Sequence, residues 1–253
     1  MKKIAVVTGA SSGMGREFAT RIAREYPIDE LWVIARRRDR LEELAQEIAV
    51  PVVAISLDLT KDESIEAYRR RVAEEQPDVR GLVNASGVGR FGRFEEMDPE
   101  TLYRMIDLNS KAYVGMTWAT LPYLGRGSEV YQLDSLSSFQ PIPYIGVYAA
   151  TKAFVLSFSR SLNVELKKRR IHVMAVCPGW VKTEFFNRAV TDDTIKYYNK
   201  FYTSKEVVTR AIYDMYRGKD VSVCGASTRA QVFLTKLLPH KLVMKIWCKQ
   251  QKK

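Results

Sequence analysis

The sequence predicts an α/β protein with a doubly wound parallel sheet in a single domain. Short apolar runs alternate with segments of helical periodicity along the chain, which is typical of strand–helix–strand units. A glycine-rich turn follows the first apolar run, and polar candidate residues come directly after the later ones. Because the carboxyl ends of parallel strands form the ligand-binding edge of such sheets, we expect these residues to meet there. No repeat, low-complexity block or linker divides the 253 residues.

Composition excludes several classes of protein. The hydrophobic fraction of 46% and the charged fraction of 27% are ordinary for a globular chain. Three cysteines lack the spacing of a disulfide framework or a zinc site, and only two histidines are present, so we expect no metal and a reducing, cytoplasmic location. The apolar run at residues 4–7 is too short for a signal-peptide core, and no run approaches the roughly 18 residues of a spanning helix.

The net charge of +11 is concentrated at the C-terminus, where residues 221–253 contain seven basic residues and no acidic one. A basic tail of this kind does not indicate nucleic acid, which a uniformly basic surface would favour. From Leu234 onward the apolar residues recur at helical spacing beside a lysine stripe. The interpretation that we favour is packing on a partner subunit or on the chain itself. Weak contact with an anionic membrane surface is the alternative.

The turn after the first apolar run, Thr8-Gly9-Ala10-Ser11-Ser12-Gly13-Met14-Gly15, leads into a segment of helical periodicity. Glycines there let backbone N–H groups approach a pyrophosphate, and the helix N-terminus favours the anion. This placement indicates a Rossmann-type nucleotide site rather than a simple tight turn, although the spacing differs from the best-known dinucleotide fingerprint. The cofactor contacts predicted in this turn are Gly9, Ser11, Ser12, Gly13, Met14 and Gly15.

The second apolar run, residues 31–35, ends in three arginines. In a doubly wound fold this strand end lies beside the adenosine ribose, where an acid binds the 2′-hydroxyl of NAD and an arginine accommodates the 2′-phosphate of NADP. Arg36 and Arg37 occupy this place, and Arg16 follows the last glycine of the turn. The sequence therefore predicts NADP(H) in preference to NAD(H). The alternative is a solvated basic start to the helix at residues 41–48.

The next two strand ends supply further candidates. Residues 52–57 end at Asp58-Leu59, where Asp58 is a candidate acceptor for the adenine amino group; alternatively, Thr60 caps a helix at residues 62–75. Residues 81–83 lead to small side chains that leave room for a cofactor. The contacts predicted here are Asp58, Leu59, Asn84, Ala85, Ser86 and Gly87. A long helix is expected at residues 99–121, with Asn109 inside it as a relay, a kink or a solvent-facing amide.

Ser135 follows the fifth apolar run, residues 130–133, and a loop leads from it to a helix expected at residues 148–167. Tyr148 and Lys152 are four residues apart and therefore share a face of that helix. An ammonium near a phenol lowers its pKa, which makes Tyr148 a candidate general acid or base for an alcohol or carbonyl oxygen. Ser135 is placed to hydrogen-bond the same oxygen. Taken alone, a tyrosine and a lysine at this spacing more often lie on the solvated face of a helix and have no catalytic role.

Taken together, these motifs resemble the short-chain dehydrogenase/reductase family over roughly residues 3 to 225. The resemblance implies that Tyr148 is the catalytic acid/base and that Ser135 orients the substrate oxygen. It implies that Lys152 binds the nicotinamide ribose and that Asn109 holds a proton-relay water. Two departures stand out: Asn84-Ala85-Ser86-Gly87 replaces the usual Asn-Asn-Ala-Gly, and Asp134 precedes Ser135. The remaining cofactor contacts that the resemblance implies are Tyr148 and Lys152, together with Pro178, Gly179, Val181 and Thr183, which follow the sixth strand, residues 171–177.

The resemblance implies an NADP(H)-dependent oxidoreductase that interconverts a hydrophobic ketone and a secondary alcohol, with a steroid-like ring or an acyl chain. The alternatives are an oxoacyl-thioester reductase and a non-catalytic nucleotide-binding scaffold. A small helical lid is expected at about residues 184–215, where six aromatic residues line a pocket or form the inner face of two helices. A basic amphipathic helix is expected at about residues 230–253. A homodimer or homotetramer is expected, through the helices that begin near Pro99 and Tyr148.

Overall fold

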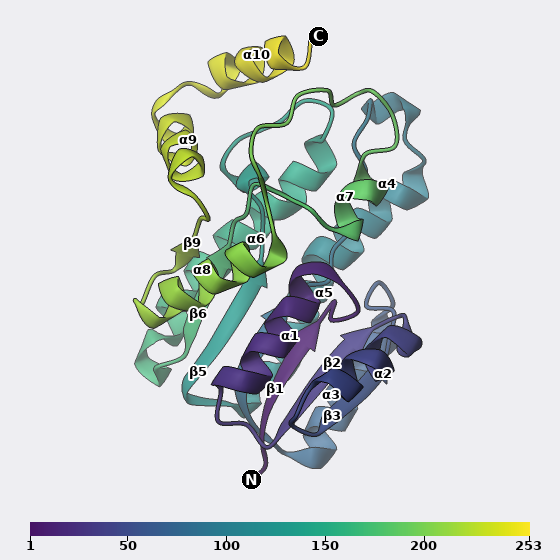
Figure 1. The fold of residues 1–253 in the computed structure, drawn as a ribbon, viewed down its shortest axis with the longest axis vertical. Helices are drawn as coiled ribbons and strands as arrows, with labels where there is room; N and C mark the ends of the chain where they lie inside the picture. The colour runs from purple at the N-terminus through teal and green to yellow at the C-terminus, as the bar shows by residue number, and fades with distance from the viewer.

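Seven parallel strands form the central sheet of the computed structural model, which describes residues 1–253 (Figure 1). Their spatial order is β3-β2-β1-β4-β5-β6-β9, so the chain starts in mid-sheet, builds to one edge, and crosses back to build the other. This reversal beside β1 is the switch point of a doubly wound sheet. The predicted Rossmann-type fold is confirmed. The strands are β1 Lys3–Thr8, β2 Glu30–Ala35, β3 Val52–Ser56, β4 Asp78–Asn84, β5 Leu124–Leu133, β6 His172–Val176 and β9 Val221–Ser222.

Helices cover both faces of the sheet because alternate side chains of each strand point to opposite faces. In β1, Ala5 and Val7 pack against one helical layer, while Ile4 and Val6 pack against the other. All four side chains are fully buried. The first layer contains α1 Gly13–Glu25, α2 Arg38–Glu47 and α8 Ser204–Tyr216, and the second contains α3 Asp62–Glu75, α5 Ala112–Thr120 and α6 Gly146–Glu165.

The long helix expected at residues 99–121 is interrupted rather than continuous. It consists of α4, Pro99–Ile106, a π-helical turn at Asp107–Lys111, and then α5. Asn109 lies in the π turn and is completely buried. Of the three roles that the sequence left open for Asn109, the structure excludes a solvent-facing amide. Single π turns of this kind occur frequently at functional sites.

The segment after β6 crosses the carboxyl edge of the sheet (Figure 1). It forms the short strand β7 Trp180–Val181, the helix α7 Glu184–Ala189, and β8 Phe201–Tyr202, which pairs in parallel with β7. The segment expected to form a lid, about residues 184–215, includes α8, which packs against α1 in the sheet layer. A capping box between Thr203 and Glu206 starts α8.

The C-terminal tail forms two helices instead of one, α9 Ala226–Leu237 and α10 His240–Gln250. Pro239 separates them, since proline cannot continue a helix. The α10 helix packs back on the chain: Val243 is buried, and Trp247 Nε1 donates to the carbonyl oxygen of Pro143 at 3.0 Å. The Gln251 amide oxygen accepts from the backbone N–H of Lys196 at 2.8 Å. None of the helices is both long and apolar enough to cross a membrane.

Candidate active site

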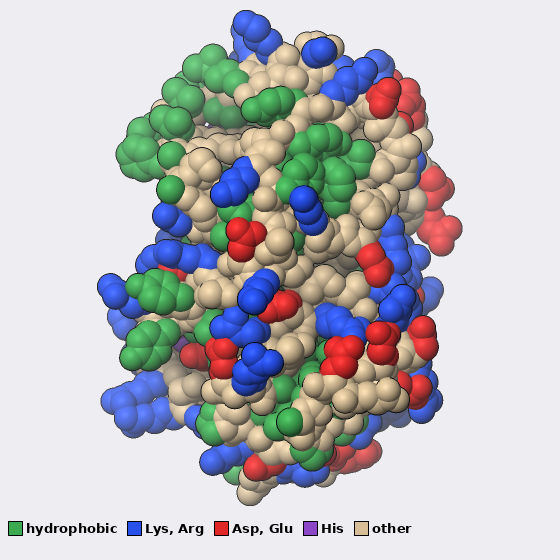
Figure 2. All heavy atoms as spheres, viewed as in Figure 1, with side chains coloured by type: hydrophobic (Ala, Val, Ile, Leu, Met, Phe, Trp, Pro, Cys, Tyr) green, Lys and Arg blue, Asp and Glu red, His purple; other side chains and the backbone are tan.

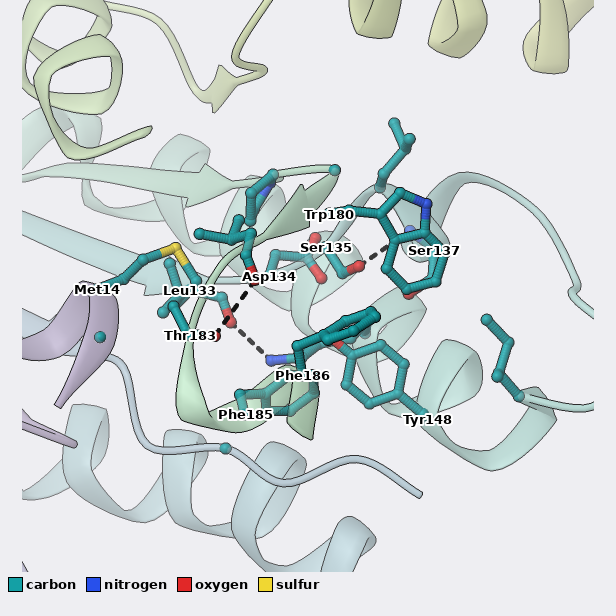
Figure 3. Close-up of a pocket in the computed structure, with 18 of the residues that line it drawn as sticks. Met14, Leu133, Asp134, Ser135, Ser137, Tyr148, Trp180, Thr183, Phe185 and Phe186 are labelled. Carbon is teal, nitrogen blue, oxygen red and sulfur yellow. Dashed lines mark hydrogen bonds between the residues drawn. The ribbon is translucent and has the colours of Figure 1, made fainter. Parts of the chain in front are cut away.

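A cavity of about 750 Å³ lies at the carboxyl edge of the sheet and extends from the glycine-rich turn to α10. Figure 3 shows its central part, where side chains from the β5 end, α6 and α7 converge. It is lined by residues from every strand end that the sequence singled out. The predicted site residues among them are Gly9, Ser11, Ser12, Gly13, Met14, Gly15, Arg36, Arg37, Asp58, Leu59, Ala85, Ser86, Gly87, Ser135, Tyr148, Lys152, Pro178, Gly179, Val181 and Thr183.

The glycine-rich turn is packed so closely that side chains are excluded from it. Gly9 has φ +68°, and a Cβ built on it would lie 2.6 Å from the carbonyl oxygen of Ala85. A Cβ on Gly15 would lie 2.3 Å from the carbonyl oxygen of Gly9. The start of α1 is thereby held directly against the end of β1, with backbone at the cavity wall. This cradle fits the pyrophosphate of a dinucleotide, which binds at a helix N-terminus.

Thr8 joins the glycine-rich turn to the β4 end. Its hydroxyl oxygen accepts hydrogen bonds from the backbone N–H of Ala85 at 3.0 Å and of Ser86 at 3.2 Å. Thr8 is 1% exposed, so the link is shielded from water. Sequence reasoning did not assign this role, because the distance of 77 positions between the partners gives no local signal.

Arg37 is the arginine that faces the glycine-rich turn. Its Nη2 donates to the hydroxyls of Ser11 at 3.0 Å and Ser12 at 2.9 Å, while Nη1 donates to Glu184 at 2.8 Å. The guanidinium therefore bridges the turn and α7 across the cavity. Glu184 was not predicted to take part, and it supplies a carboxylate that competes with any anion for Arg37.

Arg16 and Asp58, which were predicted to contact a phosphate and the adenine, interact with other residues of the protein. Arg16 pairs with Glu47 at 2.7 Å and with Glu43 at 3.5 Å on α2, and it does not line the cavity. Its predicted contact with the phosphate stays a prediction, and the two carboxylates compete with a phosphate for the guanidinium. The Asp58 Oδ1 accepts from the backbone N–H and the hydroxyl of Thr60, so Thr60 does not cap α3 as the alternative required; the N-cap is Lys61.

Both predicted asparagines lie behind the cavity wall. The Asn84 amide donates to Thr117 at 3.1 Å and to Gln132 at 3.0 Å. Asn84 belongs to β4 rather than to the loop after it, and it does not line the cavity. The Asn109 amide donates to Val88 O at 2.8 Å and accepts from Val88 N at 2.9 Å, with a further bond to Thr151 at 3.1 Å. Asn109 thus fastens the loop after β4 to α6, and its predicted water contact remains a prediction.

Tyr148 and Ser135 face each other in the cavity, from the start of α6 and the end of β5 (Figure 3). Burial raises the pKa of Tyr148 above its usual value of 10, and the hydrogen bond with Ser135 opposes that rise. The phenol therefore keeps its proton at neutral pH. Phe91 and Phe185 contact the Tyr148 ring, with centroids 5.5 and 5.6 Å away, and exclude water from it.

Lys152 lies beneath Tyr148 on the next turn of α6 and is buried. Its Nζ donates to the carbonyl oxygen of Leu133 at 2.7 Å and is 5.8 Å from the Tyr148 ring centroid. Burial lowers the pKa of Lys152 to about 8, and the charge of Asp134 opposes this shift. The ammonium is directed to a carbonyl and burial of the phenol dominates, so the net shift of the Tyr148 pKa is upward, and its predicted lowering by Lys152 during the reaction stays a prediction.

Asp134 is a buried carboxyl beside this pair, at 3% exposure. Its Oδ2 accepts from the Cys177 thiol at 3.3 Å, while Oδ1 has no hydrogen-bond partner. Burial raises the pKa of Asp134 to about 7, and the Lys152 charge opposes that rise. The sequence marked Asp134 as unusual without a role. The structure makes it an electrostatic neighbour of Lys152.

Aromatic side chains form the far end of the cavity, and the sequence predicted only some of them. Phe185 and Phe186 of α7 and Tyr197 belong to the expected aromatic segment. Trp180 contacts Phe186 and also Tyr198, at centroid distances of 6.0 and 5.1 Å. Phe91, Tyr113 and Trp247 were missed, because single aromatics in a loop, a helix and the tail have no motif around them.

The geometry offers a buried phenol, a serine hydroxyl and an ammonium next to a phosphate cradle in one cavity. A phenol that keeps its proton can donate it to a carbonyl oxygen, and the Ser135 hydroxyl is placed to hydrogen-bond the same oxygen. The aromatic end supplies apolar surface for the rest of a substrate. Such a site suits proton transfer coupled to hydride transfer from a nicotinamide.

Comparisons with known proteins agree with this geometry. The family described as short chain dehydrogenase matches residues 3–194. Sulfoacetaldehyde reductase 2 of Chromohalobacter salexigens is 34% identical over 194 residues, which cover 73% of this chain and 75% of that protein.

Two solved structures share the fold across both chains. A short-chain dehydrogenase from Sphingobium yanoikuyae in complex with NADPH has a TM-score of 0.79 and 30% identity, and 93% of each chain is covered. The bulky-bulky ketone specific alcohol dehydrogenase from Comamonas testosteroni has a TM-score of 0.75 and 26% identity, with 94% of this chain and 92% of that chain covered. The chain therefore belongs to the short-chain dehydrogenase/reductase family, and it is a dehydrogenase or reductase.

Proposed function

We propose that this protein interconverts a hydrophobic ketone and the corresponding secondary alcohol, with NADP(H) as its preferred cofactor. The observation that carries the proposal is the placement of Ser135, Tyr148 and Lys152 in one cavity with the glycine-rich turn. The nicotinamide, when bound, donates or accepts the hydride. The side chains of the protein orient the substrate and move the proton.

In the direction of reduction, the Tyr148 phenol would give its proton to the carbonyl oxygen of the substrate as negative charge develops there. The raised pKa of Tyr148 keeps that proton in place until charge develops on the oxygen. Ser135 hydrogen-bonds the same oxygen and fixes its distance from the phenol. Lys152 supplies a positive charge beneath Tyr148 that stabilises the phenolate left behind. The reverse sequence oxidises the alcohol.

The aromatic end of the cavity supports a bulky apolar substrate. Phe91, Trp180 and Phe185 stand between the Tyr148 phenol and the tail, and Ile246 and Trp247 continue the apolar wall. No acidic or basic side chain lines this end between Phe185 and α10 except Arg188. The similarity to an alcohol dehydrogenase specific for bulky-bulky ketones favours the same substrate class.

Arg37 supports the preference for NADP(H). Its guanidinium already contacts the two serines of the turn, so a 2′-phosphate would find it oriented at the ribose end of the cavity. Arg36 lies beside it, half exposed and 3.9 Å from Asp58. The Sphingobium yanoikuyae relative, whose structure contains NADPH, agrees with this preference.

A Tyr148→Phe variant tests the proposed chemistry. It retains the ring that packs against Phe91 and Phe185 but has no proton to transfer, so we expect turnover of bulky ketones to fall by about 10²- to 10⁴-fold. Quenching of tryptophan fluorescence by NADPH should be unchanged. Turnover that survives in Tyr148→Phe would disprove the mechanism. A wild-type protein that binds NADPH but reduces no ketone or thioester would favour the scaffold hypothesis.

A homodimer accompanies the proposal, because an apolar surface lies on α4, α5 and α6. Its exposed large side chains are Tyr103, Ile106, Val114, Trp118 and Phe154. An exposed apolar surface of this kind marks an interaction site. Light scattering on Trp118→Ser compared with the wild type tests this: dissociation to monomers is expected.

A further inference from the structure

An apolar surface bordered by lysines covers the outer sides of α9 and α10 (Figure 2). In the view of Figure 2, hydrophobic side chains gather at the upper left, where Figure 1 places these two helices. Five large apolar side chains there are between 43% and 65% exposed. We call this surface the tail patch; it consists of Phe233, Leu234, Leu237, Leu242 and Ile246.

The charge that α9, α10 and the residues around them bring to the tail patch has one sign. Residues 221–253 carry seven basic side chains and no acidic one. Lys236 lies on α9, and Lys241, Lys245 and Lys249 lie along α10, all of them exposed. The surface therefore combines an apolar centre with a positive border, and it is complementary to a surface that is apolar inside and negative outside.

The tail patch is continuous with the active-site cavity. Leu234 and Ile246 belong to the patch and also line the cavity. Leu238 and Val243 line it further in, and Trp247 leads toward the aromatic end beside Tyr148. An apolar path thus runs from the outer surface of α9 and α10 to the reacting phenol.

We propose that the tail patch docks on an anionic lipid bilayer, and that the cavity receives its substrate from the apolar layer of that bilayer. Exposed apolar side chains with lysines beside them are what helices that lie in the membrane interface present. The docking rests on the tail patch alone, whereas the delivery of substrate rests on the proposed function.

A second copy of the chain is a poorer occupant of the tail patch. In a two-fold symmetric contact the same patch occurs on both subunits, so the lysines of one copy would face the lysines of the other. Like charges in contact repel, whereas anionic lipid attracts each lysine. The positive border thus favours the bilayer over self-association.

Co-sedimentation of the full chain with vesicles tests the docking. We compare vesicles of phosphatidylcholine with vesicles that contain one quarter phosphatidylglycerol, at about 0.1 M salt. The partition coefficient should be at least about tenfold higher for the anionic vesicles, because several lysines lie within a Debye length of the surface. Salt at about 0.5 M should weaken binding to them. Equal or absent binding to both vesicles overturns the proposal.

Matched variants separate the contribution of the lysines to vesicle binding from that of the apolar side chains. The triple change Lys241→Gln, Lys245→Gln and Lys249→Gln should reduce anionic binding at least tenfold, whereas the control Lys167→Gln, Lys168→Gln and Lys205→Gln removes the same charge elsewhere and should not.

The apolar contribution has its own pair of variants. Phe233→Ser with Leu237→Ser should reduce binding similarly, because neither residue lines the cavity and both are exposed. The control is Phe94→Ser with Tyr216→Ser, which are also exposed. Equal losses in the test and control variants overturn the proposal. Loss of a dimer without loss of vesicle binding would instead assign the patch to a second copy, and it also overturns the proposal.

The outcome is independent of whether the proposed chemistry is correct, because sedimentation needs neither cofactor nor turnover. Tyr148→Phe should bind anionic vesicles as the wild type does. With an active enzyme, Phe233→Ser with Leu237→Ser should raise the KM for a ketone dissolved in vesicles at least tenfold, while the KM for a water-soluble ketone stays unchanged. Equal changes in both KM values would contradict delivery from the bilayer but not the docking.

Discussion

The two ends of the active-site cavity differ in the groups that form their walls. The cofactor end consists of backbone and small side chains at the ends of β1 and β4, held by the sheet and by glycines that admit no Cβ. The substrate end consists of large side chains from the loop after β4, from α7 and from α10. Both α7 and α10 lie outside the sheet layers, and Phe185 of α7 and Trp247 of α10 belong to one apolar cluster although they are far apart in sequence.

Because of this difference, the fold constrains the residues at the cofactor end, whereas the side chains at the substrate end are free to vary. A change at the cofactor end must move backbone that is part of the sheet, whereas a change at the substrate end alters one side chain among several in contact. We therefore expect single substitutions to have large and general effects at the cofactor end, and smaller, substrate-dependent effects at the other. The following predictions test this contrast.

The largest effect is expected for Gly15→Ala. The added Cβ would lie 2.3 Å from the Gly9 carbonyl oxygen, so the turn must open before α1 can pack on β1. Overpacking of this kind costs about 1–3 kcal/mol, and we expect a loss of up to about 100-fold in NADPH affinity, measured by tryptophan quenching. Gly146→Ala is the control: a Cβ there meets nothing within 4 Å, and alanine favours the helix. Similar affinities for the two variants would contradict the contrast.

The cofactor end was predictable because its signals are local. The glycine-rich turn, the strand ends and the pair Tyr148 and Lys152 lie in short motifs whose spacing alone places them on one edge of the sheet. The periodicity of the helices and strands gave the doubly wound fold for the same reason. The exact partner of each polar group was harder to predict. Asn84 is the last residue of β4, donates to Gln132, and does not line the cavity.

The substrate end was less predictable because its contacts are distant. Trp247 reaches Pro143, which is 104 positions away, and Arg37 reaches Glu184 across 147 positions. No local pattern marks such pairs. Amphipathic periodicity showed that the tail is helical, but only tertiary packing shows that it closes the cavity. The aromatic residues after Thr183 were recognised as a group, whereas the end of the lid depends on α8 packing against α1.

The second prediction concerns Arg37, which joins the two ends through Glu184. Removing a charged hydrogen-bond partner costs about 1.5–3 kcal/mol, so Arg37→Gln should weaken NADPH binding by about tenfold or more and leave NADH binding nearly unchanged. Glu184→Gln should act in the opposite direction, because it releases the guanidinium for a phosphate. Paired titrations with NADPH and NADH measure both. Equal losses for the two cofactors would show that Arg37 only supports the turn.

The third prediction concerns pH and Asp134, which lies between the two ends. The Asp134 charge raises the pKa of Lys152, which burial lowers to about 8. In Asp134→Asn this support is lost, so Lys152 becomes neutral at lower pH. The alkaline limb of the turnover profile should therefore move to lower pH by roughly one unit. Cys177→Ser retains the carboxylate and a donor to it and should leave the limb in place; an unmoved limb in Asp134→Asn would contradict the coupling.

Asp134 also predicts a dependence of stability on pH. Its pKa is raised to about 7 in the folded protein, so its contribution to stability is present at low pH and is lost as pH rises through 7. The lower pKa of Lys152 in the variant shifts the difference in the same direction, because the folded variant binds fewer protons than the unfolded one as pH rises past that pKa. The Tm of Asp134→Asn relative to the wild type should therefore be higher at about pH 7.5 than at about pH 5, as measured by calorimetry. A difference that does not vary with pH would show that folding does not raise the pKa of the Asp134 carboxyl, since the folded and unfolded states would then bind the same number of protons.

The smallest effect is expected at Trp247, at the substrate end. Trp247→Phe removes the N–H that donates to Pro143 at 3.0 Å but retains an aromatic ring in the wall. A hydrogen bond of this kind contributes about 1 kcal/mol, so α10 should be held less firmly and the KM for bulky ketones should rise about fivefold. The KM for a small ketone and the affinity for NADPH should not change, because neither ligand reaches α10. Trp118→Phe, which alters an exposed tryptophan away from the cavity, is the control. If Trp247→Phe also weakened NADPH binding, the two ends would be mechanically coupled and the contrast between them would fail.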